Sequence, residues 1–424
     1  LRQHTRDLTR GVELATGQPS RLLALAGVKA EMDVEAGRYD EAESTIRGAL
    51  NAAEGSDQRR RTLLMMQLGR LFLRRERWAE AAELFRDLGR ALSRHGPPAL
   101  IAACHFHLGN IALHERRLEE AQKCHEDALE KRRAQSLPRP TGESLCALGA
   151  VAVARGHYPQ ALSYYREARK LLQEHGRETD RGYALYGLGK AWTRLGDYAA
   201  ASNMLRRALE IRKGRDDVAG EAIARLALAE NYLCLGQPDA ALDEARQAHF
   251  HLTLLSLTSS LAKAEQLLGR IRLSQRKHDE AERHLASALD EHRRIGDRFA
   301  AGLDLGWLLE LALLSENKDQ IRRYTTDLRE IVATREQADL GEHLDFRLYR
   351  GLVWLQDHGR KVGDPLPYLE RAYREILRKA SDLDPELRHR YLFQVPDNLE
   401  IVETATHCGV AQASGAGADQ ASGA

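Results

Sequence analysis

Long apolar segments are missing from this sequence of 424 residues. No run of about 18 consecutive apolar residues occurs, which excludes an ordinary membrane-spanning helix. The first five residues are also too polar for a signal peptide. Because nothing directs the chain to or through a membrane, we expect a cytoplasmic location.

Cysteine is scarce and irregularly spaced. The five cysteines are an odd number without a regular spacing: Cys104, Cys124, Cys146, Cys234 and Cys408. This pattern argues against a disulfide framework and favours a reducing compartment. We therefore expect free thiols.

An excess of charge of one sign is absent, and so are catalytic motifs. The 63 Lys and Arg residues balance the 62 Asp and Glu residues, for a formal net charge of +1. Nothing in this balance favours nucleic acid or an anionic membrane. The sequence lacks a phosphate-binding glycine-rich loop, a His-Glu-x-x-His motif and a nucleophile elbow. We predict a protein that is not an enzyme and needs no cofactor.

An internal repeat covers most of the chain. A Leu-Gly pair, or Leu-Ala in one case, marks each repeat at Leu68-Gly69, Leu108-Gly109, Leu148-Gly149, Leu188-Gly189, Leu228-Ala229 and Leu268-Gly269. Alanine recurs three residues after each turn, at Ala42, Ala81, Ala121, Ala161, Ala201, Ala241 and Ala281. Each repeat reads as two helices joined by a tight turn, and these small residues let the two backbones approach each other.

This pattern resembles the tetratricopeptide repeat, in a variant that is longer than the usual repeat of about 34 residues. Similar long repeats occur in kinesin light chain, in cell-polarity adaptors and in bacterial signalling proteins. The resemblance covers about residues 20 to 335. It implies an all-α fold, a right-handed superhelical solenoid of helix-turn-helix pairs with an atypical helical C-terminal cap.

The repeat also predicts how the chain is organised. We expect a remnant of a preceding helix in residues 1–20, because Leu1 is not methionine and the segment after it resembles the second half of a repeat. About eight repeats occupy residues 21–335, and a degenerate repeat with the cap occupies 336–408. Residues 409–424 lack side chains that could be buried in a core and are predicted to be a disordered tail.

The C-terminal segment 384–398 resembles the closing segment of repeat regions in large bacterial signalling proteins. In those proteins a signal-transduction ATPase of the STAND type, a nucleotide cyclase or a Ser/Thr kinase precedes the repeats. This resemblance implies a sensor or scaffold region whose covalently linked N-terminal effector domain lies outside the present chain. The alternative is a free-standing adaptor that bridges two proteins.

In the family that the chain resembles, the residue after Leu-Gly faces a concave groove. This places a protein or peptide site, with acidic ligands among the candidates, at Arg70, Arg74, Asn110, His114, Tyr183, Tyr186, Lys190, Arg194, Glu230 and Arg270. Arginine and lysine there could clamp carboxylates, and an asparagine amide could pair with a peptide backbone. Equally, these charges could simply solvate a surface, and the tyrosines could pack between repeats.

The group Cys104, His105, His107, Cys124 and His125 suggests zinc at first sight. A zinc site needs about four ligands that converge on one point, whereas the first three of these residues radiate around one helix. Cys104 and His125 also fall at helix-packing positions of the repeat. We therefore predict core packing and no metal.

Overall fold

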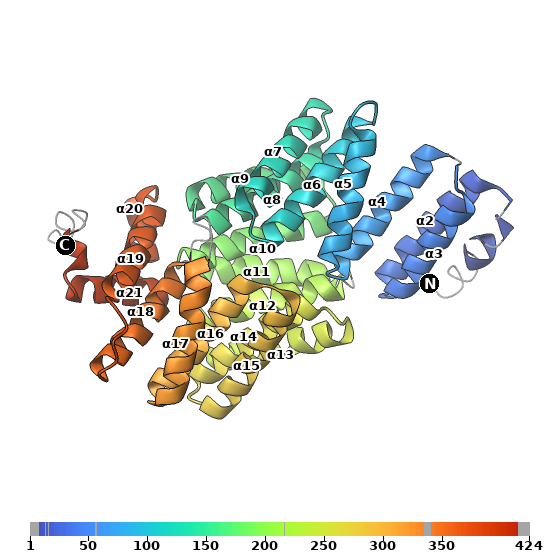
Figure 1. Ribbon diagram of the computed structural model, residues 1–424. Coiled ribbons are helices and arrows are strands. Elements are labelled where there is room, and N and C mark those ends of the chain that lie inside the picture. Colours follow the sequence, from blue (N-terminus) through green and yellow to red (C-terminus); the bar gives the residue numbers. More distant parts are fainter. Residues whose placement is uncertain are drawn as a thin grey trace. The chain divides into compact units, whose positions relative to one another are not determined.

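The protein is described by a computed structural model that covers residues 8–12, 14–15, 17–55, 57–215, 217–334 and 341–413 (Figure 1). Within these ranges the regular structure is helical, and no strand occurs. Of the helices described, none combines the length and the apolar character that a membrane crossing requires. The chain divides into two compact units, a first unit of Leu1–Ser144 with Leu255–Leu257 and a second unit of Leu145–Leu254 with Thr258–Ala424.

Helices follow one another in pairs along both units. The first unit holds α2 (Pro19–Glu35), α3 (Tyr39–Ala52), α4 (Gln58–Arg74), α5 (Trp78–Leu92), α6 (Pro98–His114) and α7 (Leu118–Ala134), and α8 (Pro138–Arg155) contributes to both units. The second unit continues with α9 (Tyr158–His175), α10 (Glu178–Arg194), α11 (Tyr198–Lys213), α12 (Val218–Cys234), α13 (Pro238–Leu254), α14 (Thr258–Ser274), α15 (His278–Ile295), α16 (Arg298–Leu314) and α17 (Lys318–Thr334). It ends with α18 (Glu342–Asp357), α19 (Leu366–Ser381), α20 (Pro385–Phe393), α21 (Pro396–His407) and α22 (Val410–Ala413). The predicted all-α arrangement of helix pairs is confirmed.

The predicted close approach at Leu-Gly is also confirmed. A Cβ atom placed on Gly69 would lie 2.5 Å from the ring of Phe85, and one on Gly189 would lie 2.6 Å from Cγ of Leu205. The same relation, with a partner sixteen residues later, holds for Gly109 with His125, Gly149 with Tyr165 and Gly269 with Leu285. A large side chain of the second helix therefore fills the space that glycine, which has no side chain, leaves on the first helix.

The pair of α12 and α13 fills this space differently. Ala229 stands where the other repeats have glycine, and Ala245 stands where they have a large side chain. Both residues are completely buried in one hydrophobic cluster. An alanine on each helix thus replaces the combination of glycine and a large residue.

This exchange can be tested by substitutions that change the pair of α12 and α13 to the arrangement found in α10 and α11. We expect Ala245→Leu to lower the free energy of unfolding by about 1–3 kcal/mol, because its side chain would need the space that Ala229 fills. Adding Ala229→Gly recreates the combination of Gly189 with Leu205 and should recover most of the loss, as measured by urea unfolding. A double variant less stable than Ala245→Leu alone would contradict the assigned contact.

The turns within the pairs use the left-handed backbone region. Gly156, Gly196 and Gly236 hold this position with φ angles of 75°, 82° and 73°. In other pairs Glu76 and Arg116 take the same conformation, with φ angles of 56° and 59°. Since residues other than glycine reach this region only at a cost, the packing of the two helices must enforce the turn in those pairs.

In the second unit, the first helices of successive pairs form an inner layer. α10 contacts α12, α12 contacts α14, α14 contacts α16, and α16 contacts α18. Each second helix lies between two first helices, as α11 does between α10 and α12. First helices that approach one another directly from repeat to repeat lie on the inner side of a curved stack.

The helices α18 to α22, which we call the cap, complete the second unit. α18 continues the stack beside α16 and α17. At the other end of the unit, the ring centroids of Tyr391 and Tyr158 are 5.5 Å apart, and Nη1 of Arg390 donates a hydrogen bond of 2.7 Å to Oδ2 of Asp197. Ile401 of α21 is buried in the hydrophobic cluster that includes residues of α8, α9 and α10. The cap therefore contacts both the last and the first helix pairs of this unit.

Some predicted boundaries fall outside the described residues. The break at 335/336 and the tail residues 414–424 lie there. Residues 410–413, which were expected to belong to the disordered tail, form α22, and Val410 and Ala411 are buried. α2 begins at Pro19, two residues before the expected start of the array.

A buried ion pair holds the cap together. Nζ of Lys379 on α19 lies 2.7 Å from Oε1 of Glu342 at the start of α18, and both side chains are almost inaccessible. Burial raises the pKa of Glu342, but the attraction of Lys379 and His343 outweighs it and lowers the pKa to about 2. The carboxylate is therefore stabilised as an anion in the folded chain.

Glu342→Gln should lower stability by about 2 kcal/mol at pH 7, because it leaves the buried charge of Lys379 with only the more distant Glu375, at 3.8 Å, as its counter-ion. A carboxyl group with a lowered pKa stabilises the fold above its ordinary pKa of 4.5, and this contribution disappears as the pH falls toward 2. The difference between the variant and the parent should shrink over that range in chemical unfolding curves. Glu386→Gln, at an exposed ion pair of the cap, is the control and should change stability little.

Candidate functional site

The predicted site residues belong to two units and are described unit by unit. Arg70 and Arg74 on α4 are exposed, but partial loss of hydration beside neighbouring side chains lowers the pKa of Arg70. Asn110 on α6 is half-buried, and the imidazole of His114 stacks on the indole of Trp78 at 3.9 Å. The first unit thus presents two exposed arginines and a ring pair, and His114 is engaged in packing.

In the second unit, α10 carries four predicted residues along one face. Tyr183, Tyr186, Lys190 and Arg194 follow one another at spacings of three, four and four residues, which places them in one row on a helix. The guanidinium of Arg212 lies 4.5 Å from the ring centroid of Tyr183 and 5.8 Å from that of Tyr186. Tyr183 is nevertheless 56% exposed, so its ring remains available to a ligand.

Ion pairs connect this row with the next first helices. Glu230 on α12 lies 3.5 Å from Arg194 and 3.8 Å from Arg270 on α14. The structure therefore brings together three of the predicted residues, each from a different repeat. Arg194 stays 48% exposed despite this pairing.

The line of charges continues into residues that the sequence analysis missed. The indole of Trp307 on α16 lies between two guanidinium groups, at 4.9 Å from Arg270 and 3.8 Å from Arg347 on α18. Nη1 of Arg350, also on α18, lies 2.8 Å from Oε2 of Glu310 on α16. Cation–π contacts and ion pairs thus alternate along the inner layer.

The cap supplies the last two carboxylates. Asp397 of α21 lies 3.6 Å from Nη2 of Arg347, and Glu400 lies 2.7 Å from Nη1 of Arg350. We call the complete set the inner-face cluster; its members are Tyr183, Tyr186, Lys190, Arg194, Glu230, Arg270, Trp307, Glu310, Arg347, Arg350, Asp397 and Glu400.

The neighbouring charges set the protonation of these carboxylates. Burial raises the pKa of Glu230, but Arg194, Arg270 and Lys190 outweigh it, so the net pKa is lowered. Asp397 follows the same pattern, and Arg347 is the largest of the attractions that lower its pKa. At Glu310 burial prevails over the arginines of α18, and its pKa is raised.

The inner-face cluster offers hydrogen-bond donors, acceptors and aromatic rings with almost balanced charge. Its five cationic side chains face four carboxylates. Because Arg194, Arg270, Arg347 and Arg350 already have carboxylate neighbours, a strongly acidic ligand gains less from this face than the sequence suggested. The arrangement is suited to a mixed polar ligand that pairs with both signs of charge.

Some members of the inner-face cluster that were not predicted could have been found from the sequence, and others could not. Glu310 and Arg350 continue the repeat spacing that joins Lys190, Glu230 and Arg270, so the repeat register was the signal. Asp397 and Glu400 come from the cap, where the register ends. No sequence signal placed them beside the repeats.

The interpretation of the cysteine and histidine group as core is supported by burial. Cys104 and His125 have no exposed surface, and Sγ of Cys104 lies 3.8 Å from Sδ of Met66. The ring of His107 stacks on Phe85 at 4.6 Å, and burial lowers the pKa of His107 to about 3. These side chains fill space between helices.

Glu230→Gln tests the electrostatic role of the inner-face cluster. It removes the carboxylate between Arg194 and Arg270, so stability should fall by about 1 kcal/mol at low ionic strength. The loss should shrink in 1 M salt, where exposed charges are screened. The matched change Glu210→Gln, at an exposed position of α11, should have no measurable effect on the melting temperature. Equal effects of the two changes would contradict the role assigned to Glu230.

Comparison with known proteins supports the repeat assignment. Four families described as tetratricopeptide repeat match the sequence, over residues 100–174, over 182–213, over 29–90 and 67–130, and over 222–247. No curated protein matches the sequence significantly.

Solved structures of similar fold share little sequence with this chain. A Rap protein complexed with Competence and Sporulation Factor has a TM-score of 0.54 at 13% identity, over 91% of this chain and 98% of that one. The Rap conjugation gene regulator of the plasmid pLS20, in complex with the Phr* peptide, has a TM-score of 0.53 at 13% identity, over 85% and 96%. The apo form of the quorum sensor NprR from B. thuringiensis has a TM-score of 0.51 at 14% identity, over 81% and 97%.

At these identities the likeness concerns the fold. It agrees with the repeated helix pairs described above. The chain contains tetratricopeptide repeats, built into an all-α solenoid.

Proposed function

We propose that this chain is a regulatory scaffold that binds a peptide, or an extended segment of a protein, on the inner-face cluster of the second unit. The observation that carries the proposal is the line of side chains from five successive first helices, α10 to α18, in which cations, carboxylates and aromatic rings alternate. An extended peptide presents donors, acceptors and side chains along its length, and such a line can pair with them one after another.

The dimensions of the inner layer agree with this ligand. Neighbouring packed helices lie roughly 10 Å apart, so five helices span roughly 40 Å. An extended chain advances about 3.3 Å per residue, which corresponds to a peptide of about twelve residues. Two of the similar solved structures, the Rap protein and the pLS20 regulator, contain Competence and Sporulation Factor and the Phr* peptide respectively. These complexes favour a peptide over a small metabolite.

Two settings for such a scaffold follow from the sequence. As the sensor region of a larger bacterial signalling protein, the second unit would transmit binding to a linked N-terminal effector. As a free-standing adaptor, the chain would hold two proteins, and the division into two compact units favours this alternative. An adaptor should lose one partner on Arg70→Glu with Arg74→Glu and the other on Lys190→Glu in co-purification experiments.

The peptide site can be tested with a display library of random 12-residue peptides selected on the full chain. Enriched peptides, measured by fluorescence anisotropy, should bind Lys190→Glu about tenfold more weakly, which corresponds to about 1.4 kcal/mol. Lys170→Glu reverses a charge at an exposed position of the second helix α9 and is the matched control. Peptides that bind both variants like the parent chain would exclude the inner-face cluster as their site, and a library without enrichment would count against a linear peptide ligand.

A further inference from the structure

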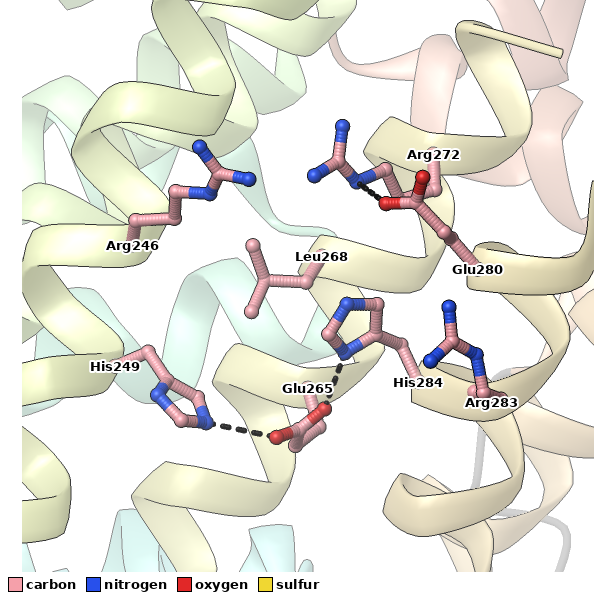
Figure 2. A pocket seen from close by; sticks show the side chains of 8 residues that line it. All are labelled: Arg246, His249, Glu265, Leu268, Arg272, Glu280, Arg283 and His284. Atoms are coloured by element: carbon pink, nitrogen blue, oxygen red, sulfur yellow. Dashed lines mark hydrogen bonds and ion pairs between the residues drawn. The ribbon is translucent and has the colours of Figure 1, made fainter. Parts of the chain in front are cut away.

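A separate cavity of about 370 Å³ lies in the second unit among α13, α14 and α15 (Figure 2). None of its lining residues belongs to the inner-face cluster. They are Arg246 and His249 from α13, Glu265, Leu268 and Arg272 from α14, and Glu280, Arg283 and His284 from α15.

Arginines from three helices surround this cavity. Figure 2 shows the guanidinium groups of Arg246 and Arg272 pointing toward each other above the side chain of Leu268. Arg272 is almost completely buried, and Nε of Arg272 lies 2.8 Å from Oε2 of Glu280. Its Nη1 also donates a hydrogen bond of 2.8 Å to Oε1 of Gln275, so this guanidinium is held in place.

The other carboxylate of the cavity is fully engaged. Oε1 of Glu265 lies 2.7 Å from Nε2 of His249, and Oε2 lies 2.6 Å from Nδ1 of His284 (Figure 2). Burial raises the pKa of Glu265, but the hydrogen bonds and charges of the two histidines outweigh it and lower the pKa to about 2. Glu265 thus fixes both rings and is not free to pair with an arginine.

Two arginines therefore remain without a counter-ion. Across the described part of the chain, neither Arg246 nor Arg283 lies within ion-pair distance of a carboxylate. The three arginines and two glutamates of the cavity sum to one positive charge. A recess in which two of three arginines have no carboxylate partner among the described residues is suited to an anion.

The donors present favour a phosphoryl group over a carboxylate. Arginine pairs with phosphate oxygens through two parallel N–H bonds, and a phosphoryl group offers three such oxygens to donors that come from several directions. A single carboxylate would pair with either Arg246 or Arg283 and leave the other without a counter-ion. The cavity volume lies within the ordinary range for small-ligand pockets, so it has room for the group that carries the phosphoryl as well.

We propose that this cavity binds a phosphoryl group, carried by a small molecule or by a phosphorylated side chain of a partner, through Arg246, Arg272 and Arg283. The site is independent of the inner-face cluster, so it stands or falls separately from the proposed peptide site. A bound phosphoryl group connects α13, α14 and α15 and gives the scaffold a second ligand-binding site.

Isothermal titration of the full chain at pH 7 and constant ionic strength tests the proposal, with inorganic phosphate and a short phosphoserine peptide as probes. At least one probe should bind, whereas acetate and the unphosphorylated peptide should bind at least tenfold more weakly. Arg246→Gln with Arg283→Gln should weaken binding of that probe at least tenfold. Arg207→Gln, an exposed arginine of α11, is the control and should leave binding unchanged. Melting curves followed by circular dichroism should show that each variant is folded.

The two probes separate the possible sources of the phosphoryl group. Binding of inorganic phosphate without a preference for the phosphopeptide assigns the site to a small molecule. Phosphopeptide binding at least tenfold tighter than inorganic phosphate assigns it to a modified partner. Failure of both probes to bind more tightly than acetate, or parent-like binding by the folded double arginine variant, would overturn the proposal.

Discussion

The contact between a glycine of the first helix and a large side chain of the second helix is the constraint on which the rest of this structure depends. At Gly69 and Gly189 the facing ring or leucine occupies the space where a Cβ atom would lie. This contact fixes the rotation of each helix within its pair, because only one face of the first helix lacks a side chain. Once that face is turned toward the second helix, the next residue along the sequence is directed elsewhere. Because the contact recurs in successive repeats, the same rotation is carried from pair to pair.

The inner-face cluster is a result of this repeated rotation. Lys190, Glu230 and Arg270 each follow the small residue of their own repeat, and for that reason they line up across three helices that are distant in sequence. Their charges alternate in sign, so neighbouring repeats attract each other at this surface. The pairing also limits what the surface can recognise, because a ligand must compete with ion pairs that already exist. The cavity among α13 to α15 differs in this respect, since two of its arginines have no carboxylate partner.

The sequence predicted the parts of this structure that follow the repeat and failed where the repeat ends. The helix pairs, the role of Gly189 and the alignment of Lys190 with Glu230 follow from spacing alone. The contact between Arg194 and Glu230 is harder to predict, because the two residues do not hold equivalent positions in their repeats. Their separation in sequence is the length of one repeat minus one helical turn. Asp397 could not be placed beside Arg347, since the cap has no register that relates it to the array. The proposed anion site among α13 to α15 depends on which carboxylates are already engaged, and pairing of that kind is a property of three-dimensional packing.

The contacts between the cap and the first helix pairs of the second unit affect how this unit folds and unfolds. In an open array each repeat touches only its neighbours, so the ends can unravel while the middle stays intact. Here Arg390 and Asp197 are 193 positions apart and in direct contact, and Tyr391 and Tyr158 are buried together nearby. Such contacts form late, because a long segment of chain must be ordered first. The second unit is therefore expected to unfold as one cooperative body, with its last helices and its first pairs lost in the same step.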